Sequence, residues 1–452
     1  MRLRKTITTI VATAILLAGW QLFAVIANQP ELIPSLPRLV RTLCEWLVSG
    51  SFYQSVGATI LRGILGMSIS FVCAIGMAGL FARFEWVYEL FRPLLAIMRS
   101  IPVISFILLA LIFLNPESIP LMIAFLTMFP LLTENLTRGI LDLRPGLSIM
   151  ARQFHIKRSN VLFQIIYPQL KPFLYSGLAS AAGFGWRAII MGEVLSQCAF
   201  GIGSEMKRAQ NFIAVPELLA WTIVAVFISF FFDKGISKVA DITPKISFAN
   251  EDQTIPTPTL SVLDTKDISF QYGIQHFSHS FQKGIIYGIS APSGKGKTTL
   301  LNLIGGILLP TEGEIHPTRH FGIATIFQQP QLLPHLTAEE NIILPLSSFL
   351  TEEKARRIAQ KHLQEMEMEP FGNRYPKELS YGQQQRIAIA RALAYPSPLL
   401  LMDEPFKGLD EALSHRIIER IREMQMKEER IILFTSHNPD EIRLLADEVI
   451  YL

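Results

Sequence analysis

Long apolar runs separated by short polar segments dominate the first half of the chain. The runs lie near residues 7–27, 56–82, 91–114, 117–133, 172–198 and 213–233. Each is close to the roughly 17–25 residues that an α-helix needs to cross a bilayer, and a helix satisfies its own backbone polar groups in lipid. The pattern therefore predicts an α-helical membrane domain with six spans over residues 1–240.

The distribution of positive charge predicts how this domain is oriented. The chain begins with the basic stretch 1–5, and the apolar run after it is longer than the core of a cleavable signal peptide. Between the fourth and fifth runs lies a basic segment, 134–171, with Arg138, Arg144, Arg152, Lys157, Arg158 and Lys171. Because positively charged loops stay in the cytoplasm, we expect the amino end, this segment and everything after residue 234 to be cytoplasmic.

The pattern changes after residue 240. Residues 241–260 contain three prolines and several small polar residues, which is typical of a linker. Beyond the linker, helical stretches alternate with short β-rich runs at 285–290, 321–327, 398–402 and 431–435. This alternation predicts an α/β domain over residues 261–452.

Composition agrees with this division and excludes some functions. Only 17% of the 452 residues are charged, below the quarter that is usual for soluble domains, and the charges concentrate after residue 250. A net charge of +3 without a basic tract gives no indication of a nucleic-acid partner. Cys44, Cys73 and Cys198 lack metal-binding spacing and are interpreted as packing residues, and whether Cys44 pairs with Cys198 stays open.

A glycine-rich loop, APSGKGKT at 291–298, follows one of the β-rich runs and nearly matches the phosphate-binding pattern G-x-x-x-x-G-K-[ST]. Backbone N–H groups of such a loop wrap phosphates, and a helix that begins near Lys297 adds its dipole. We expect Lys297 to reach the β- and γ-phosphates of a nucleotide and Thr298 to bind Mg²⁺. Ala291 replaces the first glycine, a change that is tolerated where φ is negative. The expected nucleotide-binding residues of this region are Ser293, Gly294, Lys295, Gly296, Lys297, Thr298 and Thr299.

Further polar residues complete a candidate site for ATP hydrolysis. The buried run 399–402 ends in two carboxylates, of which Asp403 suits a magnesium shell and Glu404 can polarise the attacking water as a general base. Ser380 and the amides near Gly382 begin a helical run and form a second candidate anion site. His437 follows another β-rich run and is a candidate contact for the γ-phosphate.

With these motifs in this order, residues 260–452 resemble an ATP-binding cassette (ABC) ATPase. The resemblance implies that Tyr272 stacks on adenine and that Gln328 senses the γ-phosphate and Mg²⁺. It also implies a signature formed by Ser380, Gly382 and Gln383, a D-loop that contains Asp410, and a switch histidine at His437. The catalytic residues are then Glu404, His437 and Gln328, and the Mg²⁺ ligands Thr298, Gln328 and Asp403.

Three features depart from the family pattern. They are Ala291 in the phosphate loop, Tyr381 where the signature usually has glycine, and Lys407-Gly408 ahead of Asp410. None of them removes a group that does chemistry. In this family each ATP lies between one phosphate loop and the signature of a second cassette. The resemblance therefore implies a dimer, most simply a homodimer, with a heterodimer left open.

The first half of the chain resembles bacterial importer permeases. Residues 98–102, the pair Gly192-Glu193 and residues 200–203 are similar to permeases of the nitrate, sulfonate and taurine importer family. The basic segment resembles, weakly, the importers' coupling motif, with Ala151 and Pro168 matching and Ile149 and His155 departing from it.

The same resemblance implies that the region near 151–159 docks on the cassette, with Phe154 and Ile156 available for the contact. Within the apolar runs, the charged residues Arg62, Arg187 and Glu193 are either structural or in contact with the solute, and an anionic solute would suit Arg187.

These features predict an ATP hydrolase coupled to import. The expected protein is a type I importer-like permease fused to its ATPase, in the bacterial inner membrane among lipids. It would use ATP and Mg²⁺ and take a small solute, an anion being one candidate, from a separate extracytoplasmic binding protein. An ABC exporter is the first alternative, disfavoured by the short loops at 83–90 and 134–171. An ATP-driven signalling device that moves no solute is the second. The solute itself is not predicted.

Overall fold

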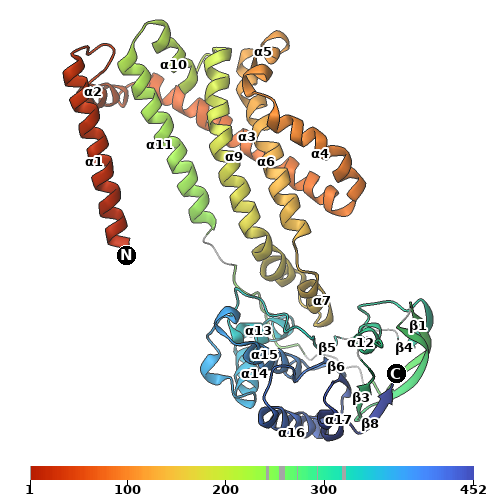
Figure 1. Cartoon of the computed structure of the whole chain (residues 1–452). Helices are drawn as coiled ribbons and strands as arrows, with labels where there is room; N and C mark the ends of the chain where they lie inside the picture. Colours follow the sequence, from red (N-terminus) through yellow and green to blue (C-terminus); the bar gives the residue numbers. More distant parts are fainter. Residues whose placement is uncertain (1, 241–243, 254–259, 272, 293, 318–321) are drawn as a thin grey trace. The chain divides into compact units, whose positions relative to one another are not determined.

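The computed structural model of the chain describes residues 2–240, 244–253, 260–271, 273–292, 294–317 and 322–452 (Figure 1). The chain divides into two compact units. The first comprises Met1–Leu143 with Gln169–Thr243, and the second Arg144–Pro168 with Pro244–Leu452. The segment Arg144–Pro168 therefore belongs to the unit that contains the carboxyl-terminal domain, although in sequence it lies between helices of the first unit.

The first unit is helical. Its elements are α1 (Arg2–Ala27), α2 (Leu36–Trp46), α3 (Gly50–Arg83), α4 (Glu85–Ser100), α5 (Val103–Phe113), the 3-10 turn η1 (Pro116–Ser118), α6 (Ile119–Leu141), most of α9 (Tyr167–Ser196), α10 (Ile202–Asn211) and α11 (Val215–Ala240). By length and composition, four stretches among the described residues can cross a membrane: Gly50–Arg83, Pro116–Leu141, Arg158–Ser196 and Val215–Ala240. A helical membrane domain followed by an α/β domain is thus confirmed.

One of the six predicted spans differs from the prediction. The expected span 91–114 is a pair of helices, α4 and α5, that meet at a bend of 94°, so it is a fifth crossing only if the pair counts as one. The break lies at Pro102, because proline cannot donate a backbone hydrogen bond and disfavours helical geometry at Ile101, whose ψ is 130°. The predicted span 7–27 lies within α1, a helix of 26 residues.

Small residues let the helices of the first unit approach closely. The buried face of α3 contains Gly63, Gly66, Ser70, Ala74 and Ala78, spaced by about one helical turn. A Cβ atom at Gly66 would lie 2.7 Å from the Cβ of Ala124 on α6, so a larger side chain would separate the two helices. Small residues are common at helix contacts in membranes, where close packing replaces the hydrophobic effect as the driving force.

The second unit is an α/β domain. Its first elements come from the inserted segment: α7 (Pro145–Gln153), α8 (Arg158–Asn160) and the π-helical turn η2 (Val161–Ile166). Its strands are β1 (Val262–Phe270), β2 (Ile274–Gln282), β3 (Ile286–Ser290), β4 (Glu312–His316), β5 (Ala324–Ile326), β6 (Leu399–Asp403), β7 (Ile431–Thr435) and β8 (Glu448–Tyr451). Its remaining helices are α12 (Lys297–Ile304), α13 (Ala338–Leu346), α14 (Glu352–Glu365), η3 (Glu369–Phe371), η4 (Pro376–Glu378), α15 (Tyr381–Ala394), α16 (Glu411–Glu428) and α17 (Pro439–Leu445).

Two sheets organise this unit. A parallel sheet has the strand order β5-β6-β7-β3-β8, and an antiparallel sheet has the order β2-β1-β4. Strands β6 and β7 are buried along their whole length, as expected for the centre of a parallel sheet covered on both faces. Ligands of such sheets bind at the carboxyl ends of the strands, which here are the ends of β3, β6 and β7.

Candidate functional site

The phosphate loop leaves the carboxyl end of β3 and leads into α12. Gly294 and Gly296 have φ values of 82° and 91°, a region that glycine adopts without strain. Ala291 is not among the described residues with positive φ, so its methyl group is compatible with the loop. The Nζ of Lys297 donates to the carbonyl oxygen of Ala291 at 2.7 Å, which holds the ammonium group against the loop. The predicted residue Ser293 lies outside the described residues.

The second half of the site is the end of β6, which brings Asp403 to the start of α12. The Thr298 hydroxyl donates to Oδ2 of Asp403 at 2.9 Å, and the Thr435 hydroxyl donates to Oδ1 at 2.8 Å. Hydroxyl and carboxylate oxygens are the ligands that Mg²⁺ takes in nucleotide sites, so Thr298 and Asp403 fit that ion. Thr435 comes from β7, whose parallel register places it beside Asp403.

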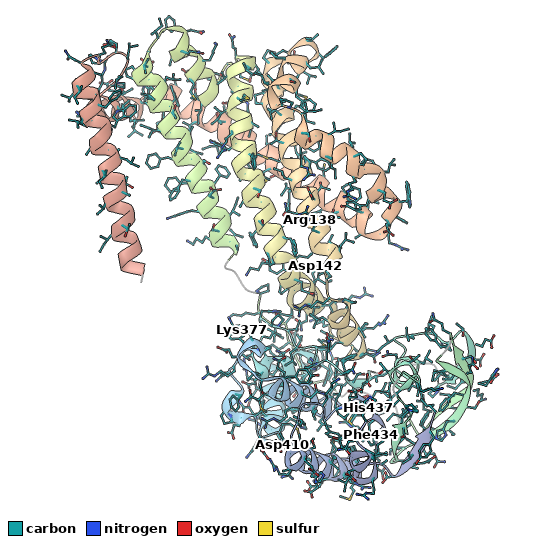
Figure 2. The ribbon with its side chains drawn as sticks, viewed as in Figure 1. Arg138, Asp142, Lys377, Asp410, Phe434 and His437 are labelled. Carbon is teal, nitrogen blue, oxygen red and sulfur yellow. The ribbon has the colours of Figure 1, made fainter. Side chains whose placement is uncertain are left out.

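Glu404 follows Asp403 with a φ of 48°, which is uncommon for a residue other than glycine. Its backbone N–H donates to the hydroxyl of Thr435 at 3.1 Å. Its carboxylate lies 3.0 Å from Nε2 of His437 and 3.1 Å from Nζ of Lys407. Strained backbone of this kind clusters at functional sites. Figure 2 labels His437 close to Phe434, which lies on β7.

The pKa values of the two carboxylates are shifted in opposite directions. Burial raises the pKa of Asp403, although hydrogen bonds from two threonine hydroxyls oppose it. Burial acts to raise the pKa of Glu404 as well, but hydrogen bonds from Lys407 and Gln328 outweigh it and leave the pKa lowered. Glu404 is therefore ionised and able to accept a proton, whereas a cation beside Asp403 would offset the cost of burying its charge.

The predicted signature begins α15. Ser380 caps this helix: its hydroxyl accepts from the backbone N–H of Gln383, and the Gln383 side chain accepts from the backbone N–H of Ser380. Among the described residues, no hydrogen bond joins Ser380, Gly382 or Gln383 to the phosphate loop of the same chain.

The other predicted residues take varied places. Asp410 caps α16 by accepting from the backbone N–H of Leu413 at 2.9 Å, and Figure 2 labels it in the same unit as His437. Lys295 lies in the phosphate loop and Thr299 in the first turn of α12. The expected adenine-stacking residue Tyr272 lies outside the described residues.

The inserted segment is anchored on the ATPase unit. Phe154 is fully buried, and its ring lies 5.2 Å from that of Tyr395 at an angle of 89°. The backbone carbonyl of Gln153 accepts from Ile323, and its side chain donates to the carbonyl of Gly305 at 2.8 Å. The hypothesis that Phe154 docks on this domain is confirmed, as is that for Ile156, which lies in the same hydrophobic cluster.

The sequence of the chain matches known families over both units. Residues 56–233 match a family model described as "Binding-protein-dependent transport system inner membrane component", and residues 274–407 match one described as "ABC transporter". A thiamine import ATP-binding protein, ThiQ of Yersinia pseudotuberculosis, is 35% identical over 186 residues, or 39% of this chain and 79% of that protein. The chain belongs to the ABC transporter family.

Other relatives give the same assignment. The ABC transporter ATP-binding protein MJ0796 of Methanocaldococcus jannaschii is 34% identical, over 40% of this chain and 85% of that protein. The Fe(3+) ions import ATP-binding protein FbpC of Rhizobium etli is 35% identical over 40% of this chain, which spans only 54% of that relative. A dimeric structure of MJ0796 is 31% identical in sequence to this chain. The match covers 42% of this chain and 94% of the MJ0796 chain, with a TM-score of 0.40.

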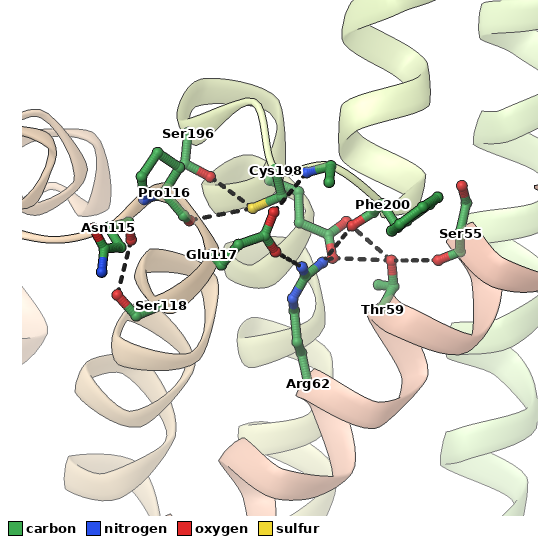
Figure 3. Close-up of polar contacts among 12 residues, drawn as sticks. Ser55, Thr59, Arg62, Asn115, Pro116, Glu117, Ser118, Ser196, Cys198 and Phe200 are labelled. Carbon is green, nitrogen blue, oxygen red and sulfur yellow. Dashed lines mark hydrogen bonds and ion pairs between the residues drawn. The ribbon is translucent and has the colours of Figure 1, made fainter.

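Two charged residues of the membrane unit form a structural pair in this ABC transporter chain. Arg62 and Glu193 lie 2.7 Å apart, and Glu193 is fully buried. Glu193 also accepts from the hydroxyl of Thr59 and from the backbone N–H of Gly203. Arg62 pairs in addition with Glu117 at 2.6 Å (Figure 3). Because these charges are satisfied by one another, the structural interpretation left open by the sequence is favoured for this pair.

Arg187 has a different environment. Its side chain is exposed, and it has no ion pair or hydrogen bond with the residues that the structure describes. It lines a cavity of about 750 Å³ in the membrane unit, together with residues of α9 and α11 such as Met191, Thr222 and Phe230. Asp233 lines the same cavity. Arg187 therefore remains a candidate for solute contact.

Several residues of the site escape prediction from the sequence. Thr435 hydrogen-bonds the carboxylate of Asp403 and the backbone N–H of Glu404. Its sequence signal is its place at the end of a β-rich run, as Asp403 ends another. Asn160, in the inserted segment, is 1% exposed and hydrogen-bonds both backbone groups of Ser247 in the linker. No sequence motif marks it.

Proposed function

We propose that the chain is one half of an ATP-driven importer. Two copies would lie in the bacterial inner membrane, with the amino ends and ATPase domains in the cytoplasm, and would take a small solute from a separate extracytoplasmic binding protein. The observation that supports this best is the burial of Phe154, which comes from a segment between two membrane helices, in the core of the ATPase unit. The relatives ThiQ and FbpC, named as import ATP-binding proteins, favour import over export.

In this proposal each polar residue of the site has a role in ATP hydrolysis. Lys297 binds the β- and γ-phosphates once ATP replaces its contact with Ala291. Thr298, Asp403 and Gln328 would hold Mg²⁺, and the bound ion would supply positive charge to the same phosphates. Glu404 accepts the proton of the attacking water as general base, because its low pKa keeps it ionised.

His437 acts next to this base. Its Nε2 lies 3.0 Å from the Glu404 carboxylate. In this proposal His437 also contacts the γ-phosphate of ATP. Removing either side chain would leave ATP binding by the phosphate loop in place while slowing hydrolysis.

A homodimer would complete both ATP sites. Each copy contributes its phosphate loop to one ATP and Ser380, Gly382 and Gln383 to the other. Each copy has one phosphate loop and one signature, so two ATP sites that each use a loop and a signature from different copies require a second cassette.

For the solute we propose an anion, recognised by Arg187. An arginine within a membrane helix is costly unless it meets water or a charged partner, and the cavity beside Arg187 is large enough for a small molecule. Uptake into cells should fall strongly in Arg187→Ala and be partly kept in Arg187→Lys, which keeps the charge. Equal uptake by both variants and the unchanged chain would remove Arg187 from the pathway.

Native mass spectrometry of the Glu404→Gln protein, held with ATP and exposed to an extract of its own cell envelope, tests the whole proposal. We expect two copies with one additional soluble protein, and the ligand of that protein would identify the solute. Two copies with ATP but no soluble partner would favour export or signalling without transport. A complex with a different permease–ATPase chain would replace the homodimer by a heterodimer.

A further inference from the structure

Tyr381 is the first residue of α15 and stands within the signature. Its side chain is 42% exposed, yet its hydroxyl has a defined partner. The hydroxyl donates to the backbone carbonyl of Gln328 at 2.8 Å. The signature, which serves the ATP of the second copy, is thus bonded to the segment that carries Gln328, which serves the ATP of its own copy.

The ring of Tyr381 also lies against Gly408. A Cβ atom at Gly408 would be 2.8 Å from Cδ1 and 3.3 Å from Cε1 of the tyrosine ring, and the φ of Gly408 is 78°. The contact continues at Gly382, where a Cβ atom would lie 2.7 Å from the carbonyl oxygen of Gly408. Two departures from the family pattern, the tyrosine in the signature and the glycine ahead of Asp410, are therefore complementary in shape.

Gln328 and Gly408, the two residues that Tyr381 contacts, are each linked to the general base Glu404. The Gln328 side chain is one of the hydrogen-bonding groups that lower the pKa of Glu404. Lys407, which precedes Gly408 in the chain, lies 3.1 Å from the Glu404 carboxylate. A closed cycle of contacts within one cassette thus joins Tyr381, Gln328, Glu404, Lys407 and Gly408.

We propose that Tyr381 is a positioning residue that couples the two ATP sites of the dimer, an inference that rests on the proposed homodimeric function. When ATP rearranges the contacts of Gln328 and Glu404, the displacement reaches Tyr381 through the hydroxyl on one side and through Gly408 on the other. Tyr381 begins α15, so the displacement moves Ser380 and Gly382 relative to the second copy's ATP. Occupation of one site then prepares the other.

The test is the steady-state ATPase rate of the full chain in lipid nanodiscs, measured as a function of ATP concentration. Tyr381→Phe removes the hydroxyl and keeps the ring. Tyr451→Phe is the matched control, because Tyr451 lies on β8 and is 79% exposed. We expect a Hill coefficient above 1 for the unchanged chain and the control. In Tyr381→Phe it should move toward 1, with kcat lower by about 2- to 10-fold, the effect of one hydrogen bond. The half-saturating ATP concentration should stay within about twofold, since the phosphate loop is untouched.

A double-mutant cycle tests the contact with Gly408 separately. Gly408→Ala alone should lower kcat, because the added methyl group meets the tyrosine ring. In the Tyr381→Gly background, Gly408→Ala should lower kcat by a several-fold smaller factor. The backbone strain of alanine at positive φ is present in both backgrounds and cancels in the comparison. Equal costs in the two backgrounds would overturn the role of this contact.

The outcomes separate this inference from the proposed function. Dimeric, ATP-hydrolysing protein with the same Hill coefficient in Tyr381→Phe and in the control would overturn the coupling and leave the importer untouched. A Hill coefficient of 1 in the unchanged chain would do the same. Absence of ATP hydrolysis or of a dimer in the unchanged chain would instead contradict the proposed function itself.

Discussion

The guanidinium carbon of Arg391 lies 5.5 Å from the ring centre of Phe154. Arg391 is 1% exposed, and its terminal nitrogens donate to the carbonyls of Pro330 and Gln331, each at 2.8 Å. A single buried side chain thus contacts both the segment inserted between membrane helices and the backbone just beyond Gln328. Arg391 therefore joins that segment to the nucleotide-site region through direct contacts.

Phe154→Ala should loosen the inserted segment from the ATPase unit. Replacing a buried phenylalanine by alanine costs about 3–5 kcal/mol in a protein core, so we expect the undocked state to become about 150- to 4,000-fold more populated. Trypsin reports this state, because Arg152, Lys157 and Arg158 are exposed cleavage sites in the segment, and cleavage follows the open population when closing is fast.

Phe163→Ala is the control for this experiment. Phe163 lies in the same segment but is 48% exposed, so its loss should change the rate of cleavage little. Equal rates for Phe154→Ala and Phe163→Ala would show that Phe154 does not hold the segment.

Asn160 should hold the linker in place. Its side-chain amide donates to the carbonyl of Ser247 at 2.8 Å and to the hydroxyl of Ser347 at 2.8 Å, while its oxygen accepts from the N–H of Ser247 at 2.9 Å. In Asn160→Leu these groups lose their partner, at a cost of about 1–3 kcal/mol. We expect about 10- to 100-fold faster hydrogen exchange at Ser247. Ser159→Ala is the control, because the buried Ser159 hydroxyl has no hydrogen-bond partner within the described residues. Similar exchange in both variants would refute the role of Asn160.

Thr435 should matter for hydrolysis more than for ATP binding. Thr435→Val keeps the shape of the side chain but removes the hydroxyl that donates to Asp403 and accepts from the Glu404 N–H. We expect kcat to fall by about 10- to 100-fold, since a buried carboxylate loses a hydrogen bond and the general base loses its anchor. Thr435→Ser keeps the hydroxyl and should recover most of the rate. If the valine and serine variants hydrolyse ATP equally fast, the hydroxyl has no such role.

The features that the sequence predicts correctly are those marked by residues close together in the chain. The apolar runs and the residues around 291–298 and 403–404 are local signals, and the structure places helices, strands and the Thr298–Asp403 contact accordingly. The bend at Pro102 also has a local signal, the proline itself, but the apolar run continues across it and predicts a single span. The contacts of Asn160 and Arg391 depend on pairing residues that lie far apart in the chain, and one sequence does not contain that information.

Lys407 gives the last prediction, a shift in the pH dependence of ATP hydrolysis. The pKa of Glu404 is lowered because the hydrogen bonds to its carboxylate, with that from Lys407 first among them, outweigh the effect of burial. The base therefore stays ionised to a lower pH than an ordinary glutamate, and the rate should fall only as the pH drops through this lowered pKa. Lys407→Met removes the ammonium group, so the pKa of Glu404 rises and the acid limb of the kcat profile moves to higher pH. Lys427→Met, at an exposed position on α16, is the control and should keep the original profile. If the two acid limbs coincide, the contact between Lys407 and Glu404 does not persist in the hydrolysing dimer, and the general base is then tuned by His437 and Gln328 alone.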